Sequence, residues 1–274
     1  MSKVVPLVFA AAFLAGSFAI AAPQGAAPDF APDSLTSWLP VGDDYLPPLS
    51  GPGPVTFDPA HRYVPNFTGE QPTYRVADLT NPILQPWARD QMRAANEAVL
   101  AGKVPFRARE SCWPAGVPTF LVYALATRLF FLQTPHEVTL IYQGGAERRH
   151  VYLDVPHSPA PAPSWYGESV GHYEGDTLVV DTIGFNTRTY VDNYRTPHTA
   201  QLHVVERYRL TEGGQGLEVA FRVEDPGAFT TSWSGMQRFR RTRQALGEQP
   251  CAESNVRYFS YEAYPVPVAT RPEF

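Results

Sequence analysis

Acid–base chemistry is suggested first by a histidine and an aspartate in one short stretch. Gly175-Asp176 has the chemistry of a two-residue turn, because glycine tolerates the positive φ that such turns require. Residues 168–174 and 177–183 are then the strands of a β-hairpin, and His172 and Asp181 are diagonal neighbours on one of its faces. A histidine oriented by a carboxylate is a general acid–base arrangement. Both are therefore candidate catalytic residues.

The opposite face of this hairpin carries Tyr173, Leu178 and Val180 and is equally suited to burial. Strand alternation puts the two sets on opposite sides without saying which side is the interior. If the apolar set points inwards, His172 lies at the surface, which is the simpler interpretation. The sequence leaves both arrangements open.

Two charged side chains fall in apolar rows. Glu206 shares a strand face with the apolar residues of 201–210, and Arg149 shares one with those of 148–155. A buried carboxylate needs a partner, and a guanidinium can supply one. A structural ion pair and a catalytic pair are equally consistent with this pattern. In the catalytic pair, Glu206 is the acid or base and Arg149 stabilises an anion.

Further histidines and carboxylates lie in or next to predicted loops. Asp154 and His157 end a strand, and Asp192, His198 and His203 lie in or after a later loop. Loops at the mouth of a barrel are where sites usually collect. We therefore add His198 to the catalytic candidates, and His157 and His203 to the ligand-binding candidates. No HxH, HExxH or CxxC spacing accompanies them, so no metal site is predicted.

Other candidates for ligand binding are a cation and three aromatic residues that could line an apolar wall. They are Arg207, Tyr208, Trp165 and Tyr190. No phosphate-binding loop, dinucleotide fingerprint or haem-attachment motif is present, so no cofactor is predicted.

Strands are the elements predicted to position these residues. Short β-type segments separated by turn signals favour an antiparallel sandwich or barrel. Because a barrel removes exposed edges, we expect an all-β, mainly antiparallel β-barrel over residues 104–274, with a lipocalin- or calycin-like barrel as one form that fits. The predicted strands are 120–123, 128–133, 137–143, 148–155, 168–174, 177–183, 201–210, 217–225, 233–242 and 256–261.

Three segments are predicted before the barrel. Residues 1–21 resemble a signal peptide, with Lys3, an apolar run and small residues before a cleavage site near Ala21. Residues 22–83 are rich in Pro and Gly, a composition that cannot sustain a helix or a central strand. They are expected to form an extended arm that lies on the barrel and buries its aromatic rings. Residues 84–103 are expected to form a flanking helix, with Pro86 in its first turn and an apolar stripe that includes Trp87.

The signal-like segment implies a periplasmic or secreted location. Cys112 and Cys251 are the only two cysteines, and in such an exported protein this pair is expected to form a disulfide. The net charge of -5 does not favour binding to nucleic acid. The N-terminal apolar run is too short for a membrane span, so no stable membrane insertion is expected after cleavage.

Several motifs stand out along residues 84–255. They are Cys112-Trp-Pro-Ala-Gly-Val-Pro118, Gln133-Thr-Pro135, Trp165-Tyr-Gly-Glu-Ser-Val-Gly171, Glu174-Gly-Asp-Thr-Leu-Val-Val-Asp-Thr-Ile-Gly-Phe185, Pro197-His198, Leu202-His-Val-Val-Glu-Arg207, Asp225-Pro226 and Cys251-Ala-Glu253. Together they resemble the motifs of a family of exported, largely uncharacterised bacterial proteins. The resemblance implies an exported domain, with weight on Arg149, Asp181, His198, Glu206 and Arg207. The chain departs from the family pattern at 154–157, where Asp-Gly-Arg-Pro-His is usual, and at Tyr190 and Thr199, where Trp and Ser are usual.

Three functions are compatible with these features. The first is a cofactor-independent acid–base enzyme, of lyase, isomerase or hydrolase type, acting on a small aromatic or polycyclic molecule in a barrel pocket. The second is a periplasmic binding or carrier protein in which the charged pair is structural. The third is an envelope-associated structural or interaction protein. The inward-facing charges favour the first, because a carrier of apolar ligands has less use for them.

Overall fold

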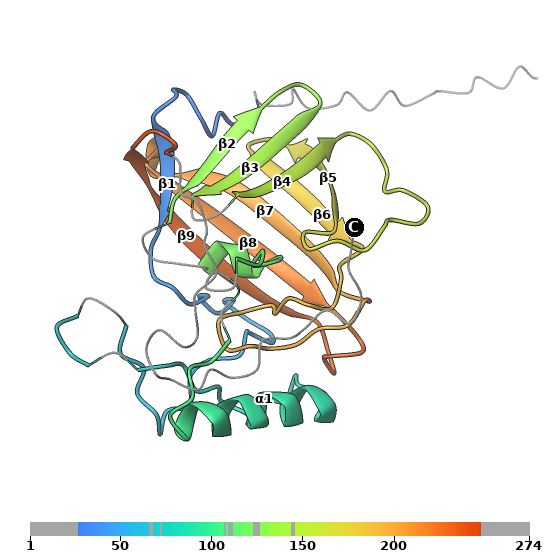
Figure 1. The fold of residues 1–274 in the computed structure, drawn as a ribbon. Coiled ribbons are helices and arrows are strands. Elements are labelled where there is room, and N and C mark those ends of the chain that lie inside the picture. The colour runs from blue at the N-terminus through green and yellow to red at the C-terminus, as the bar shows by residue number, and fades with distance from the viewer. Residues whose placement is uncertain are drawn as a thin grey trace, which may run out of the picture.

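The computed structural model describes residues 27–65, 68–71, 73–106, 108, 112–122, 127–143 and 146–247. Within them, nine strands close into one barrel, in which each strand pairs with the next along the chain and β9 pairs with β1 (Figure 1). The predicted all-β barrel is confirmed. The strands are β1 (Thr36–Pro40), β2 (Leu129–Gln133), β3 (Glu137–Gln143), β4 (Ala146–Leu153), β5 (Glu168–Glu174), β6 (Thr177–Ile183), β7 (His203–Thr211), β8 (Gly216–Glu224) and β9 (Trp233–Arg243).

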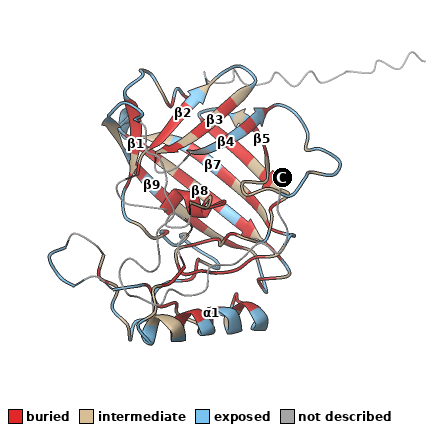
Figure 2. Cartoon of the chain, in the orientation of Figure 1, coloured by how far each residue is buried: buried red, intermediate tan, exposed pale blue. Residues whose placement is uncertain are grey.

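Buried and exposed side chains alternate along these strands, which Figure 2 shows as banding across the barrel wall. β5 and β6 form the predicted hairpin, with Gly175 at a φ of 61° in the turn and Val170 opposite Asp181. The buried face of β6 includes Leu178, which is completely buried, whereas His172 is exposed. The interior face is therefore the apolar one, and His172 lies on the outside of the barrel.

One junction departs from the predicted succession of hairpins. β4 and β5 run parallel and pair at three positions, from Val151 with Ser169 to Leu153 with Gly171. The reason is the connecting segment 154–167, which is long enough to carry the chain back along the barrel before β5 begins. The wall between β4 and β5 is consequently joined by a short main-chain ladder.

The Pro-rich arm contributes a strand that composition argued against. β1 pairs with β9 along its whole length and with β2 through Trp38 and Leu129. Pro40 lies at the end of the strand, beyond the single pair that β1 makes with β2. The Trp38 side chain, 1% exposed, supplies apolar burial. The expectation that the arm holds no central strand was wrong here, whereas its Trp38 and Tyr45 rings are buried as expected. The barrel begins within the arm and not at residue 104.

The arm also fills one end of the barrel. Phe30 is completely buried, and its ring stacks on Phe131 with the centroids 4.8 Å apart. The Phe30 N–H donates to Gln133 Oε1 at 2.7 Å, and the Trp38 indole N–H donates to the Phe30 carbonyl at 2.9 Å. These contacts fix the first described residues of the chain against β1 and β2.

A short 3₁₀ helix, η2 (Thr119–Val122), packs inside the barrel with all four residues buried. The predicted strand 120–123 was therefore wrong over its described residues. The Phe120 N–H donates to the Gly116 carbonyl and the Leu121 N–H donates to the Pro118 carbonyl, which are turn-type bonds of a 3₁₀ or α turn. The apolar run 120–122 is buried as a helical plug and not as a strand.

The predicted helix is confirmed as α1 (Pro86–Leu100), which begins at Pro86 and lies below the barrel in Figure 1. Its buried face differs from the expected stripe, because Trp87 is 42% exposed while Ala88, Met92 and Asn96 are buried. Trp87 instead donates its indole N–H to the Gly227 carbonyl. No helix among the described residues is long and apolar enough to cross a membrane.

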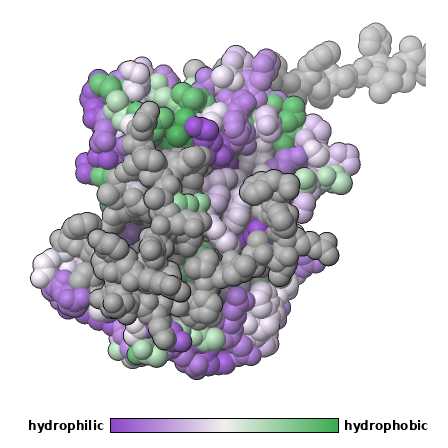
Figure 3. All heavy atoms as spheres, in the orientation of Figure 1, coloured by the Kyte–Doolittle hydropathy of each residue, from purple (hydrophilic) through white to green (hydrophobic). Residues whose placement is uncertain are grey.

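Three predictions fall outside the described residues: the signal peptide 1–21, the strand 256–261 and Cys251. On the face seen in Figure 3, hydrophilic residues predominate, and hydrophobic ones gather at the upper end over β2 to β4. Leu132 of β2 and Val155, just after β4, are exposed. Exposed apolar residues of this kind are ordinary on a folded surface.

Candidate functional site

Arg149 and Glu206, the two charged residues predicted to point inwards, meet inside the barrel. Arg149 Nη2 lies 2.5 Å from Glu206 Oε2, with the side chains 3% and 0% exposed. Arg149 also donates from Nη2 to Thr182 Oγ1 at 2.7 Å and from Nε to Ser169 Oγ at 3.0 Å. The predicted buried ion pair is confirmed as a contact, and two hydroxyls complete the surroundings of the guanidinium.

The second oxygen of Glu206 is occupied as well. The Tyr208 hydroxyl donates to Glu206 Oε1 at 2.8 Å, and Arg149 Nη1 lies 3.5 Å from the Tyr208 oxygen. The ring of Phe120 from η2 lies 5.3 Å from Arg149 Cζ. Burial and the carboxylate of Glu206 both raise the pKa of Tyr208, so this phenol stays protonated and keeps donating. The inner network is thus a satisfied set of buried polar groups.

Arg149 ties together four strands at the parallel junction. It lies on β4, two residues before the first pair with β5, and its partners lie on β5, β6 and β7. Burial is the largest single influence and lowers the pKa of Arg149, but the charges and hydrogen bonds of Glu206 and Tyr208 together outweigh it, so the net shift is upward. The guanidinium therefore remains charged and acts as a side-chain clamp where the main-chain ladder is short.

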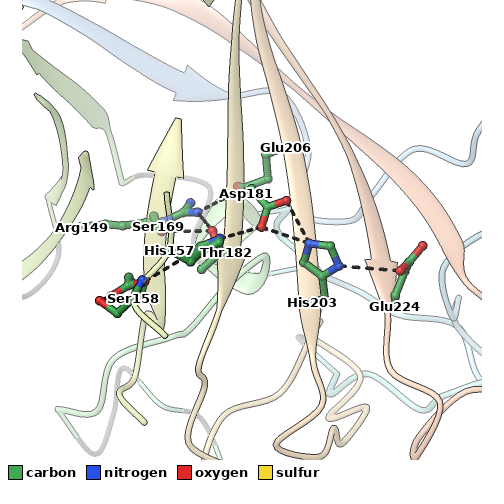
Figure 4. A network of polar contacts seen from close by, with 10 residues as sticks. Arg149, His157, Ser158, Ser169, Asp181, Thr182, His203, Glu206 and Glu224 are labelled. Carbon is green, nitrogen blue, oxygen red and sulfur yellow. Dashed lines mark hydrogen bonds and ion pairs between the residues drawn. The ribbon is translucent and has the colours of Figure 1, made fainter. Parts of the chain in front are cut away.

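A second polar network lies outside the barrel on the same strands (Figure 4). Asp181 Oδ1 lies 2.9 Å from His157 Nε2 and 3.0 Å from His203 Nε2. His157 comes from the segment between β4 and β5, Asp181 from β6 and His203 from β7. We call these three residues, together with Glu168 and Glu224, the outer array.

Glu168 and Glu224 occupy the ends of the outer array. Glu168 Oε1 lies 3.1 Å from His157 Nδ1, and Glu224 Oε2 lies 3.6 Å from His203 Nδ1. Each imidazole therefore has a carboxylate at both of its ring nitrogens. Figure 4 shows His157, Asp181, His203 and Glu224 in a row across neighbouring strands. The Arg149 and Glu206 side chains, in contrast, are almost completely buried.

Contacts within the outer array shift the pKa values of Asp181 and His203. The hydrogen bond from His203 lowers the pKa of Asp181, helped by His157 and opposed by partial burial. The same hydrogen bond raises the pKa of His203, so its imidazolium form persists to higher pH. The side chains of His157, His203 and Asp181 are 21%, 33% and 39% exposed. They are accessible to solvent, and imidazoles oriented by a carboxylate can donate and accept protons.

His172 is not part of this array, which corrects the predicted contact with Asp181. His172 Nε2 lies 3.0 Å from Glu174, and Arg207 lies 2.6 Å from another oxygen of the same carboxylate. The reason is that the His172 side chain, on the outer face of β5, extends along its own strand to Glu174 and not across to Asp181 on β6. His172 and Arg207 thus form an exposed ion-pair cluster of their own.

His198 is also separate from the outer array. Its Nδ1 lies 2.9 Å from the Thr199 carbonyl, to which it donates, and its Nε2 accepts from the Thr189 hydroxyl at 2.8 Å. Burial lowers its pKa, which favours the neutral ring. Asp225 accepts from the N–H and the hydroxyl of Thr199. His198 therefore holds a buried turn together, away from Arg149 and Glu206.

The predicted aromatic candidates do not line the inner network as a group. Only Tyr208 touches it; Trp165 packs edge-on against Trp113 with centroids 5.1 Å apart, and Tyr190 lies 6.1 Å from Phe106. Cys112, next to Trp113, is disulfide-bonded, and its predicted partner Cys251 is outside the described residues. In the described part of the chain, no group of three or more His, Cys, Asp or Glu is arranged to hold a metal ion.

Comparisons with protein-family models, with curated proteins and with solved structures found no match to this chain. The site is therefore defined by its geometry. Sequence reasoning missed Glu168, Glu224, Ser169 and Thr182. Strand alternation could have found Glu168, because it shares the outer face with Asp181 across the hairpin.

Proposed function

We propose that this protein is an exported acid–base enzyme whose proton-transfer groups are the imidazoles of the outer array. The observation that carries the proposal is one carboxylate, Asp181, shared by His157 and His203 at 2.9 and 3.0 Å. A carboxylate that orients an imidazole and stabilises its charged form is the usual partner of a general acid or base. Here one carboxylate serves two rings.

The accessibility of the two networks favours the outer one. Both oxygens of Glu206 are occupied and its side chain is 0% exposed, so a substrate would have to displace internal partners to reach it. His157 and His203 keep a fifth to a third of their side-chain surface exposed. The inner pair then has a structural role, and Arg149 needs no catalytic one.

Two rings on one carboxylate suit a reaction in which a proton leaves one substrate atom and another is supplied to a second atom. His203, with its raised pKa, is suited to be the acid. A neutral His157 would be the base, and Asp181 would stay ionised between them. Lyase, isomerase and hydrolase reactions all use this pair of steps. The substrate class that we propose, a small aromatic or polycyclic molecule, is the one expected from the sequence.

Export is part of the same proposal. The signal-like residues 1–21 and a disulfide at Cys112 both fit an oxidising compartment such as the periplasm. A stable structure maintained outside the cytoplasm is also consistent with a closed barrel, which leaves no long unpaired strand edge.

The test is turnover by the mature, disulfide-intact protein of a pooled library of small aromatic esters, lactones and enol ethers, followed by mass spectrometry. Asp181→Asn should abolish any turnover found while preserving the far-UV spectrum of the barrel. His172→Gln, which alters an exposed histidine outside the array, should leave the rate unchanged. Full activity in the Asp181→Asn variant would refute the proposal. Native mass spectrometry showing a retained ligand that is never converted would instead favour a carrier.

A further inference from the structure

His157 makes more contacts than a neutral imidazole can satisfy with protons. Its Nδ1 lies 3.1 Å from Glu168 Oε1 and its Nε2 lies 2.9 Å from Asp181 Oδ1. A neutral ring carries one N–H, so one of these contacts would place a nitrogen lone pair against a carboxylate oxygen. An imidazolium donates to both carboxylates. The observed geometry is complete only when His157 is protonated.

These contacts fasten one end of the segment 154–167 to the barrel. Ser158, the next residue, donates to Glu168 from its N–H at 2.7 Å and from its hydroxyl at 2.5 Å. The other end is held by main-chain bonds between Ser164 and residues 184 and 186. Between the two ends, residues 159, 161 and 163 are prolines, which have no N–H to donate. The attachment at residues 157–158 therefore decides how firmly this part of the segment is held.

The charges around His157 respond to its proton. Glu168 of β5 and Asp181 of β6 face the ring directly, and Asp181 also faces His203 of β7. Beyond His203 lies Glu224 of β8, which pairs with Arg222 at 2.6 Å. With both imidazoles protonated, the row alternates in sign from Glu168 to Glu224. When the protons are lost, three carboxylates remain in a row, with Arg222 as the cation paired with one of them among the described residues. The attraction that holds residue 157 then disappears.

We propose that residues 157–158 are a pH-dependent strap, which a protonated His157 holds against β5 and β6 and which loss of that proton loosens. The inference rests on the proposed function and deepens it, because His157 is one of the two imidazoles of the outer array. With the proton present, Nδ1 and Nε2 both donate and the segment is pinned to both strands. Without it, one anchor of His157 is released, so its neutral ring can turn towards a substrate. The strap thus couples the position of His157 to the protonation state that a base requires.

Hydrogen exchange tests this directly on the mature, disulfide-intact protein without any substrate. Exchange of the amides of 158–166, corrected for the intrinsic effect of pH, should be about fivefold faster at pH 8.0 than at pH 5.5. His157→Gln should exchange rapidly at both pH values, because glutamine cannot become a cation. His172→Gln is the matched control: it removes another exposed, carboxylate-paired histidine and should keep the pH dependence of the wild type.

Equal protection at pH 5.5 and pH 8.0 in the wild type would overturn the strap, as would loss of the pH dependence in His172→Gln. Protection restored at pH 8.0 by added Zn²⁺ and removed by EDTA would also overturn it, because a cation and not a proton would then join the groups. The result is separable from the catalytic proposal. A pH-dependent segment without turnover would refute only the enzyme, and turnover with a pH-independent segment would refute only the strap.

Discussion

Replacing Glu206 by Gln tests whether the inner network is a structural clamp. The carboxylate is 0% exposed and its Arg149 partner 3% exposed, so glutamine would leave a buried guanidinium without a counter-charge. Breaking a buried pair in this way costs about 3–5 kcal/mol of unfolding free energy. For a barrel of this size, that corresponds to a fall in Tm of roughly 6–20 °C. The loss should be this large because the hydroxyls of Ser169 and Thr182 accept hydrogen bonds from Arg149 but are neutral, so they cannot balance its charge.

The assay is urea unfolding of the mature, disulfide-intact protein, with Glu168→Gln as the matched control. Glu168 lies at the outer surface, and its side-chain partners in the described part of the chain are His157 and Ser158, so its replacement should have a much smaller effect. A variant carrying both Arg149→Met and Glu206→Met should recover most of the loss, because removing both charges removes the desolvation penalty. An unchanged urea midpoint for Glu206→Gln, or a double variant no more stable than the single one, would refute the clamp.

Two further predictions concern buried titratable groups that hold turns, and they have opposite signs. Burial raises the pKa of Asp192 to about 6, against hydrogen bonds from Thr196 and Tyr194. The folded state therefore holds this proton more tightly than the unfolded state, and stability falls as pH rises through this range. Asp192→Asn, which keeps an acceptor oxygen, should raise the unfolding free energy at pH 7.5 by about 1–3 kcal/mol; a less stable variant would contradict this. Burial instead lowers the pKa of His198, so the unfolded state takes up its proton first and stability falls on acidification below about pH 6.5. His198→Gln should flatten the pH dependence of the urea midpoint between pH 6.5 and 5.0, and an unchanged slope would refute the burial argument.

Strand periodicity allowed the parts of the fold that depend on neighbouring residues to be predicted. The turn at Gly175-Asp176 sets the register of the hairpin, and Val170 lies opposite Asp181 as expected. The inward direction of Glu206 and Arg149 followed from the same alternation. If either strand presented its other face to the interior, the polar residues of that face would all be buried. These inferences required no knowledge of contacts with residues far away in the sequence.

Features that depend on long-range contacts were not predictable in this way. β1 lies in a Pro-rich arm, and its strand conformation depends on pairing with β9, about two hundred residues later in the chain. Of the outer array, His157, Asp181 and His203 were candidates from the sequence, but no local pattern predicted that they meet. His157 reaches Asp181 only because the segment 154–167 makes β4 and β5 parallel. That crossover has no local signature beyond its prolines.

The two networks lie back to back because alternation puts adjacent residues on opposite sides of one wall. Asp181 points outwards and Thr182 inwards on β6; His203 points outwards and Glu206 inwards on β7. The clamp thus binds together, from the inside, the strands whose outer faces carry the acid–base groups. Burying its charges costs stability, which burying apolar residues would not. The clamp nevertheless holds β4, β5, β6 and β7 in one register, where the main-chain ladder between β4 and β5 is short. Positional precision of this kind is what shared hydrogen bonds at 2.9 and 3.0 Å on Asp181 require. The clamp therefore contributes to the outer site by positioning its strands, although no atom of Arg149 or Glu206 needs to meet a substrate.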